Sequence, residues 1–544
     1  MKKYRTTLFC VSPIVIAFSV LLIGFFGNNV PHTSGGNETM PEITQAVFDK
    51  TVQVSGIDTT SADIKIAEKN SKAIEAAIKS ADKNTALLLP DGVIAFCGPL
   101  DIKNKENIAI RGGENTELLN VSYDSVNRSG EKANVFKIRD SSNVYIENIA
   151  IDFLSHTTAD GIITEIKNGR TYFEIYPEFI SGNKRAIVGG EKVYSVLTAD
   201  DTVFLDESWP EGGSTVLKKE SESIFSVSME IGKVGNRICC RISCGNVASP
   251  SIFVNRTNGL YLDGITCYSC PSAFIYAPYG NANFEFSNLK IGVRDGSKAL
   301  LASNEDCIHA KHIKGKLSVT DSSFYGIGDD ALNSHTKLCV VESVNESTIT
   351  CVVGGDNSTP ADGIFNKGDT VELIGRNYKS LGTAVVVKQE GKKLVLESVP
   401  ENVNKGCLIQ NITYSPEVTF KNCKVGFGRA RGVLLQAKNA TVEGCTFENL
   451  RLSAVLAAPD FEYWYEGGFT ENLTVKGNVF RNCTNYVKNN GFAVVHINSS
   501  HDQVQNKPNV EGHKNVTVTE NTFEDCDGRH VRATSTVNFV TDAE

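Results

Sequence analysis

Three aspartates in the middle of the chain have the residue type and spacing needed for acid–base chemistry. Asp306 lies in the segment Asn304-Glu-Asp-Cys-Ile-His309, and Asp329 and Asp330 lie in Gly328-Asp-Asp-Ala-Leu-Asn-Ser-His335. Like charges held close together raise one another's pKa, so one carboxyl can keep its proton beside an ionised neighbour. A protonated acid beside an ionised base is what the cleavage of a glycosidic bond requires. The alternative is that these aspartates only cap backbone amides in turns.

A second polar cluster follows in Arg429-Ala-Arg-Gly432 and in Ala458-Pro-Asp-Phe-Glu-Tyr-Trp-Tyr-Glu466. Arg431 can donate its planar fork to a carboxylate or to sugar hydroxyls, and Trp464 offers a flat face on which a pyranose can stack. A buried Arg431–Asp460 ion pair, with Trp464 filling the adjacent core, explains the same residues equally well. Both interpretations stay open at this point.

Metal binding is the less favoured use of the histidines near the aspartates. His309 and His312 are three residues apart, a spacing that does not place two side chains cleanly on one face of a strand. The isolated Cys267-Tyr-Ser-Cys270 pair has no partner pair with zinc-site spacing. We expect no metal and no cofactor.

A recurring strand-and-turn motif must position these residues. It begins with segments such as Asn143-Val-Tyr-Ile-Glu-Asn-Ile and Asn258-Gly-Leu-Tyr-Leu-Asp-Gly-Ile, and it resumes as Ala440-Thr-Val-Glu-Gly-Cys-Thr-Phe and Leu473-Thr-Val-Lys-Gly-Asn-Val-Phe. Each copy alternates apolar and polar residues and then turns at Asn, Asp or Gly. Repeats roughly 22 to 43 residues apart, without helices between them, predict an all-β parallel β-helix with variable loops.

This architecture would bring the aspartates together. Asp306 and Asp329 are 23 residues apart, about one coil, so the spacing predicts that they stack on adjacent coils about 4.8 Å apart. Asp329 and Asp330 would point to opposite faces of a regular strand. Both reach one site only if the chain bends, as Gly326 and Gly328 would permit.

Segments outside the repeats predict a cap and two insertions. Ala73, Ile74, Ala77 and Ile78 have helical spacing within residues 70–83, which predicts a short helix covering the open end of the solenoid. Residues 161–243 and 338–412 have denser strand patterns and are expected to be β-rich, barrel-like insertions. The expected organisation is a signal peptide or N-terminal anchor (1–31), a cap and first coils (32–160), the first insertion (161–243), coils with the aspartates (244–337), the second insertion (338–412) and C-terminal coils (413–544).

Composition and charge restrict the partners. The formal net charge is −9, and no block of Lys and Arg follows the N-terminus, so nucleic acid is an unfavourable partner and neutral sugars fit better. The basic N-terminus precedes an apolar run over about residues 8–26, typical of export. The run fits either a cleaved signal peptide or an uncleaved membrane anchor. We therefore expect an exported protein that touches a membrane, if at all, through this segment.

The fifteen cysteines allow two interpretations. In an exported chain the cluster of Cys239, Cys240, Cys244, Cys267 and Cys270 suggests disulfides, although their pairing cannot be assigned. By contrast, the cysteines of the C-terminal repeats recur at what reads as one position and are expected to stack as small buried side chains. These are Cys423, Cys445, Cys483 and Cys526.

Taken together, the segments resemble glycoside hydrolase family 110, exo-acting α-galactosidases that remove terminal α-1,3-linked galactose. The matching elements are Asp306-Cys-Ile-His, Asp329-Asp-Ala-Leu-Asn-Ser-His335, Arg429-Ala-Arg-Gly-Val-Leu-Leu and Asp460 to Glu466. The resemblance implies a right-handed parallel β-helix with an inserted β-domain, inversion of configuration and no catalytic metal. Thr336 departs from the family pattern, in which a Gly follows the His.

The resemblance also implies residue roles. Asp306, Asp329 and Asp330 become the catalytic residues; by analogy with polygalacturonases one acid protonates the leaving oxygen while two aspartates position water, and we take Asp329 as the acid. The candidate contacts to galactose are His335, Arg431, Asp460, Trp464 and Glu466.

Two rival functions differ in what they predict. A β-helix polysaccharide lyase would need Ca²⁺ and a basic residue and would release an unsaturated product. A non-catalytic surface adhesin would keep every property after Asp329→Asn. Because a carboxylate cluster beside an aromatic platform is uncommon by chance, we favour a hydrolase. Terminal α-galactosyl glycans are the substrate that the resemblance implies.

Overall fold

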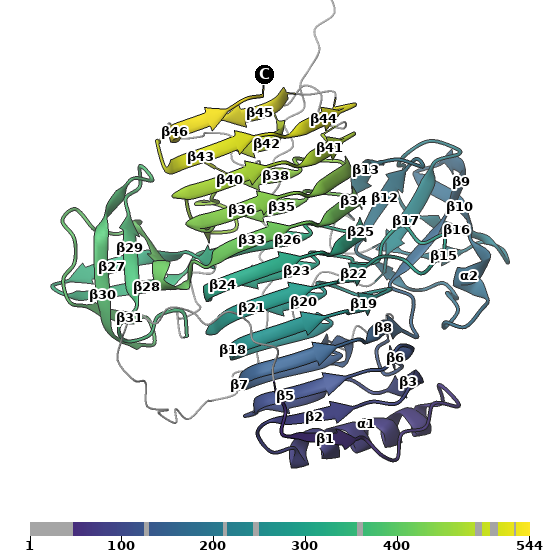
Figure 1. Cartoon of the computed structure of the whole chain (residues 1–544). Coiled ribbons are helices and arrows are strands. Elements are labelled where there is room, and N and C mark those ends of the chain that lie inside the picture. The colour runs from purple at the N-terminus through teal and green to yellow at the C-terminus, as the bar shows by residue number, and fades with distance from the viewer. Residues whose placement is uncertain are drawn as a thin grey trace, which may run out of the picture. The chain divides into compact units, whose positions relative to one another are not determined.

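Short parallel strands stacked in coils form the body of the protein, a parallel β-helix (Figure 1). The computed structural model describes residues 47–124, 130–209, 215–242, 250–355, 363–484, 492–500, 510–526 and 529–543. The apolar N-terminal run lies outside these residues. Within the described part of the chain, no helix has both the length and the apolar character required to cross a bilayer.

The coils have three faces, and each face is a ladder of parallel strands. The long strands β7 and β18 take part in both the first and the third ladder, because β4 pairs with the start of β7 and β20 with the start of β18. The first ladder contains β1 (Lys50–Gln53), β2 (Thr85–Leu88), β5 (Glu106–Arg111), β7 (Phe136–Glu147), β18 (Ile252–Asp263), β21 (Asn281–Ser287), β24 (Ile313–Thr320), β33 (Glu417–Lys421), β36 (Asn439–Glu443), β40 (Asn472–Lys476), β43 (His513–Thr519) and β46 (Thr536–Thr541).

The two other ladders complete each coil. The second contains β3 (Gly92–Phe96), β6 (Thr116–Asn120), β8 (Ala150–Phe153), β19 (Thr266–Cys267), β22 (Lys290–Ile291), β25 (Ser323–Ile327), β34 (Lys424–Gly428), β37 (Thr446–Leu450), β41 (Val479–Arg481) and β44 (Thr522–Glu524). The third contains β4 (Leu100–Lys103), β20 (Ile275–Ala277), β23 (Ile308–Lys311), β26 (Leu332–Lys337), β35 (Val433–Leu435), β38 (Val455–Ala457), β42 (Ala493–Ile497) and β45 (Arg529–Ala533).

The repeated motif produces this stack because its alternating residues meet their equivalents on the next coil. Val442 pairs in register with Phe420 on one side and with Val475 on the other, and all three are buried. Along the second ladder Phe447 and Phe480 stack with ring centroids 5.3 Å apart. Burial of such side chains is the main favourable free energy of the fold. The fold predicted from the repeats is confirmed.

Helix α1 (Ile64–Ser80) packs against β3 and β4 at the N-terminal end of the stack (Figure 1). It begins six residues before the predicted start at residue 70, because Asp63 caps it by accepting a hydrogen bond from the backbone N–H of Lys65 at 2.8 Å. The helix buries Ile74 and Ile78 against the core. The predicted cap is therefore present, with a longer helix.

The first insertion is an antiparallel sheet with its own buried core. It starts at Thr158, three residues before the predicted boundary, because β9 pairs from its first residue with β17 of the insertion. In sheet order the strands are β13 (Phe204–Ser208), β12 (Ser195–Ala199), β17 (Arg237–Arg241), β9 (Thr158–Lys167), β10 (Arg170–Ile175), β16 (Ile224–Val227) and β15 (Lys218–Lys219), and the same segment holds β11 (Lys192–Val193), β14 (Thr215–Val216) and the short helix α2 (Pro177–Ile180).

The second insertion is a closed antiparallel barrel, which follows β26 directly and lies on the opposite flank of the coils in Figure 1. Its first strand pairs with its last, so the chain leaves and re-enters the coils at neighbouring points. In barrel order the strands are β27 (Cys339–Asn345), β28 (Thr348–Val353), β31 (Lys393–Leu396), β30 (Ser380–Glu390), β29 (Thr370–Ile374) and β32 (Leu408–Asn411).

All cysteines in the described residues are free. The disulfides considered for Cys239, Cys240, Cys267 and Cys270 are therefore not formed, and Cys244 lies outside the described residues. The C-terminal cysteines are stacked, but at two positions of the coil instead of one. Cys423 aligns with Cys445 at one turn, whereas Cys483 aligns with Cys526 at another, as the strand registers require.

Candidate active site

Asp306, Asp330 and Arg431 occupy the same position on three successive coils. Each precedes a strand of the third ladder by two residues, and those strands pair Ile308 with Leu332 and Leu332 with Val433. Asp306 therefore aligns with Asp330, 24 residues away, and not with Asp329 as the spacing of 23 suggested. The backbone N–H of Asp330 confirms this alignment by donating to Oδ1 of Asp306 at 2.9 Å.

Two glycines shape the turn that presents Asp329 and Asp330. Gly326 has φ +68°, and a Cβ at Gly328 would lie 2.4 Å from the carbonyl oxygen of Asn304. This close approach requires glycine. The turn exposes 35% of the Asp329 side chain and leaves Asp330 only 1% exposed. Oxygen atoms of Asp306, Asp329 and Asp330 nevertheless all lie within 4.8 Å of one another.

Arginines from the coil after the barrel neutralise two of these carboxylates. Arg431 donates from Nε and Nη2 to the two oxygens of Asp330, at 2.8 and 3.1 Å. Arg429 Nη2 lies 2.9 Å from Asp329 Oδ2. Arg429 also pairs with Glu207 of the first insertion at 2.8 Å. The candidate site therefore combines residues from three coils with one from the inserted sheet.

Burial shifts the pKa values at this site. Burial and the charge of Asp329 raise the pKa of Asp306 well above its ordinary value. Burial also raises the pKa of Asp330 to about 7, against the opposing effect of Arg431. Because carboxyl groups this close cannot all ionise at neutral pH, the cluster can hold a proton beside an ionised carboxylate, as acid–base catalysis requires.

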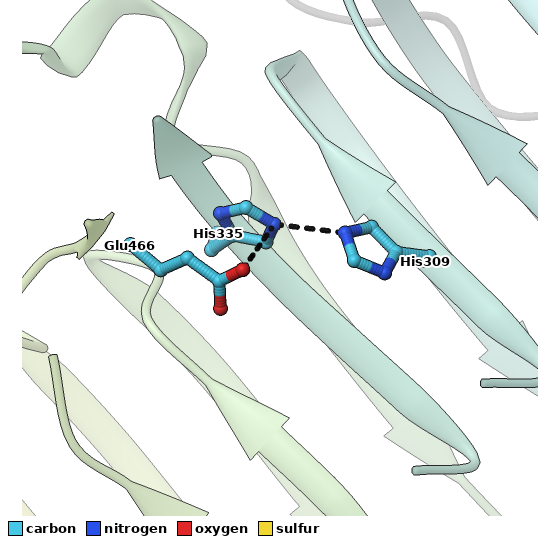
Figure 2. Close-up of side chains that lie close together, drawn as sticks. All are labelled: His309, His335 and Glu466. Atoms are coloured by element: carbon cyan, nitrogen blue, oxygen red, sulfur yellow. Dashed lines mark hydrogen bonds and ion pairs between the residues drawn. The ribbon is translucent and has the colours of Figure 1, made fainter. Parts of the chain in front are cut away.

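His309, His335 and Glu466 form a second cluster beside the aspartates (Figure 2). Nε2 of His309 lies 3.0 Å from Nε2 of His335, which lies 3.5 Å from Oε1 of Glu466. The other nitrogen of His309, Nδ1, is 2.6 Å from Oδ2 of Asp306. Burial lowers the pKa of both histidines and raises that of Glu466. Two imidazoles and a carboxylate form a donor set that a zinc ion also uses.

His312, considered as a possible metal ligand, lies apart from this cluster. Its Nε2 accepts the backbone N–H of Lys337 at 3.0 Å, and its ring packs against Tyr279 and Tyr414. Burial lowers the pKa of His312 to about 3. These contacts assign His312 to the packing between the coils and the barrel.

Asp460 builds the turn that carries Trp464. Its Oδ1 accepts the backbone N–H groups of Glu462, Tyr463 and Trp464, at 3.0, 2.7 and 3.1 Å, and Asp460 is fully buried. It therefore positions the turn, and the predicted contact of Asp460 with galactose stays a prediction. Trp464 is 50% exposed, so the alternative of Trp464 in the core beside an Arg431–Asp460 pair is wrong.

Three residues that complete the site were absent from the predicted set. His309 had a usable signal, since it follows Asp306 by three residues in the same segment. Arg429 is in the same motif as Arg431. Glu207 had no signal, because it lies in the first insertion, 222 residues before Arg429.

Comparisons with known proteins agree with the fold and point to one class of relatives. A family model described as the right-handed β-helix region matches residues 362–542. Alpha-1,3-galactosidase A of Akkermansia muciniphila is 28% identical over 429 residues, which cover 72% of this chain and 67% of that protein. The corresponding protein of Bacteroides thetaiotaomicron is 28% identical over 282 residues, covering 50% and 47%. Alpha-1,3-galactosidase B of the same species is 25% identical over 426 residues, covering 71% and 66%.

Among solved structures, an exopolygalacturonase from Thermotoga maritima aligns with 88% of this chain and 88% of its own, at 12% identity and a TM-score of 0.36. The matched regions span between about half and two thirds of the galactosidases named above.

Proposed function

We propose that the protein is an exo-acting glycoside hydrolase that removes terminal α-1,3-linked galactose from glycans. The observation that carries the chemistry is the cluster of Asp306, Asp329 and Asp330, whose oxygens lie within 4.8 Å of one another. The sugar and linkage are those in the names of the curated relatives.

The reaction needs one acid and one base. A carboxyl group donates its proton to the glycosidic oxygen while the bond from that oxygen to C1 of galactose breaks. A water molecule attacks C1 and loses a proton to a second carboxylate. The raised pKa values of the buried Asp306 and Asp330 supply a protonated carboxyl group at neutral pH. Arg429 and Arg431 stabilise the carboxylate that positions water.

Trp464 and the neighbouring polar groups are suited to hold the sugar. The exposed face of Trp464 can stack on the apolar face of a pyranose, and His335 and Glu466 can hydrogen-bond its hydroxyls. Arg431 is occupied by Asp330, so we assign it to the carboxylate in place of the galactose. The apolar N-terminal run supports export, which would bring the enzyme to extracellular glycans.

Inversion of configuration is part of the proposal, by analogy with sites in which two aspartates position one water. Inverting glycosidases commonly keep their carboxyl groups about 6.5–9.5 Å apart, and retaining ones about 5–5.5 Å. The closest oxygens here lie within 4.8 Å, so the stereochemistry is a discriminating measurement.

Proton NMR of the protein mixed with a terminal α-1,3-galactosyl oligosaccharide tests the proposal. We expect β-galactose to appear first with the wild type, and no galactose with Asp329→Asn or from the α-1,4-linked isomer. Early α-galactose would establish retention, and a folded protein that releases no galactose would contradict the assigned activity.

A further inference from the structure

A cavity of about 690 Å³ lies between the coils and the first insertion. One wall comes from the second ladder and the turns that follow its strands, and the other comes from helix α2 and the residues after that helix (Figure 1). Ligand pockets in proteins commonly measure about 300–1,000 Å³, so this cavity is large enough for a small saccharide. Its lining residues differ from those assigned above to catalysis or to galactose.

Ion pairs within the walls engage both cations among the lining residues. Arg294 bridges two carboxylates, because its Nη2 donates to Glu117 and to Asp152, each at 2.8 Å. Lys184 donates to the other oxygen of Asp152 at 2.7 Å and to Oγ of Ser269 at 3.1 Å. These bonds join the segment after α2 to the coils and hold the two walls of the cavity together.

The charge balance of the lining favours an uncharged ligand. Both cations are already paired, and two further carboxyl groups, those of Glu178 and Asp295, line the cavity. An anionic ligand would therefore meet an excess of negative charge. The cations that occupy Asp152 and Glu117 disfavour a metal ion as the ligand.

Polar groups of the lining match the two roles of a sugar hydroxyl. His156 is 8% exposed, and its Nε2 has no hydrogen-bond partner within the described residues. Burial, and then the charge of Lys184, lower the pKa of His156 to about 4, so its ring is neutral at pH 7. The hydrogen bond to the backbone of Glu178 favours the protonated ring, so the ring donates it and Nε2 keeps a lone pair. A hydroxyl group can donate to such a lone pair and accept the third hydrogen of Lys184.

Apolar side chains of the lining supply surface for the C–H groups of a sugar ring. Val93 is 43% exposed, and Leu119 and Leu154 are partly buried. Tyr268 also lines the cavity, with Cζ of Arg294 lying 3.8 Å from the centroid of its ring. A lining that combines apolar surface with a few placed polar groups is typical of small-molecule sites.

We propose that this cavity is a carbohydrate-binding site, separate from the catalytic cluster, that holds an uncharged saccharide. The inference goes beyond the proposed hydrolase function, because none of its evidence comes from the aspartates. In an enzyme that trims the ends of glycans, a second binding site raises the effective concentration of the glycan at the catalytic cluster.

Binding of the full chain to immobilised uncharged oligosaccharides that lack α-linked galactose tests the site apart from the hydrolase reaction. We expect at least one of them to bind, and to bind more tightly than its sulfated counterpart. Ser181→Trp should lower that affinity by about tenfold or more, because Ser181 is an exposed lining residue and the indole would fill the cavity. Ser80→Trp is the matched control and should bind as the wild type does. Ser80 ends helix α1, its Oγ donates to a carbonyl of that helix as that of Ser181 does in α2, and it lies outside the cavity.

His156→Phe provides a second variant and decides the test if Ser181→Trp does not fold. It keeps an aromatic ring against Phe179, whose centroid lies 4.8 Å from that of His156, and it removes the lone pair. The loss of one hydrogen bond should weaken binding by about three- to tenfold.

Three results would each overturn the proposal. They are no binding to any uncharged oligosaccharide, unchanged affinity in the folded variants, and tighter binding of the sulfated counterparts. Release of galactose from α-1,3-galactosides is measured separately on the wild type, so failure of the proposed function and failure of this site are distinct outcomes.

Discussion

Arg431 and Asp330 are hydrogen-bonded on adjacent coils although 101 residues separate them in the chain. The whole barrel lies within that separation, so the carboxylate and its cation come from either side of an inserted domain. Their register depends on the pairing of β26 with β35. The Arg431–Asp330 ion pair therefore forms only if the coil after the barrel pairs in the correct register with the coil before it.

Arg431→Lys should lower kcat/KM by about 10- to 100-fold, equivalent to roughly 1.4–2.8 kcal/mol. Lysine keeps the charge but cannot make the two parallel hydrogen bonds to Asp330. Arg256→Lys, which alters a half-exposed pair with Asp140, is the matched control and should retain full activity. Equal kcat/KM values in the two variants would contradict this role of Arg431.

Asp306→Asn and Asp329→Asn should each reduce kcat by about a thousandfold, within the usual contribution of a general acid or base. Asp321→Asn is the control, because Asp321 is an exposed turn aspartate of the same coil as Asp329 and accepts a hydrogen bond from Asn422. Steady-state kinetics on one galactoside compares the three. If all three variants behave alike, the aspartates of the cluster are only turn residues.

Trp464→Ala should raise KM for oligosaccharides about tenfold and leave kcat nearly unchanged. An exposed indole contributes stacking in the ground state and the transition state alike, and such binding appears in KM. Trp209→Ala provides a matched change at a similarly exposed tryptophan of the first insertion. A selective fall in kcat would instead place Trp464 in the chemical step.

Asp152→Asn should destabilise the fold by about 1–3 kcal/mol, because it removes the charge of a buried carboxylate that accepts hydrogen bonds from two partly exposed cations. Asp152 is 2% exposed and lies 2.7 Å from Lys184 and 2.8 Å from Arg294. The exposed pair of Lys83 and Glu106 is the comparison, and Glu106→Gln should change the free energy of unfolding by less than about 0.5 kcal/mol. Denaturant unfolding of both variants measures the difference, and equal midpoints would refute it.

The same carboxylate predicts a pH dependence of stability. Burial raises the pKa of Asp152, but the hydrogen bonds and charges of its partners lower it by more, so the net shift is downward. These partners are Lys184, Ser269 and Arg294. A depressed folded-state pKa adds stability that is complete above the unfolded value, about 3.9, and is lost as the pH falls through the folded value. The wild type should therefore lose more stability than Asp152→Asn below pH about 4, as thermal unfolding would show.

The sequence repeat was enough to predict the coils. The number of residues between two positions, however, did not predict correctly which residues align on adjacent coils. Strand periodicity and turn residues act locally, so the β-helix and both insertions follow from short segments. The alignment of Asp306 with Asp330 depends on one residue more in the coil than the spacing of Asp306 and Asp329 suggested. The strand registers also decide which cysteines stack, because they align Cys445 with Asn478 and not with Cys483.

Contacts between distant segments were beyond sequence reasoning. Glu207 contacts Arg429 only because the sheet of the first insertion packs beside the coil that carries Arg429. Asp460 has the sequence context of a ligand, but its burial and its three backbone hydrogen bonds assign it to a turn. The exposure of Trp464 follows from that turn.

The pairing of the first and last barrel strands has a further consequence for how the molecule can vary. Cys339 of β27 pairs with Ile409 of β32, so the barrel closes its own chain ends and presents the coils with only a short gap to bridge. The conformational entropy lost on ordering the inserted segment is then offset by contacts within the barrel rather than by contacts with the coils. Barrels of different size or sequence could be exchanged at this junction without disturbing the ladder beneath, which would let related chains diversify the surroundings of a fixed catalytic centre.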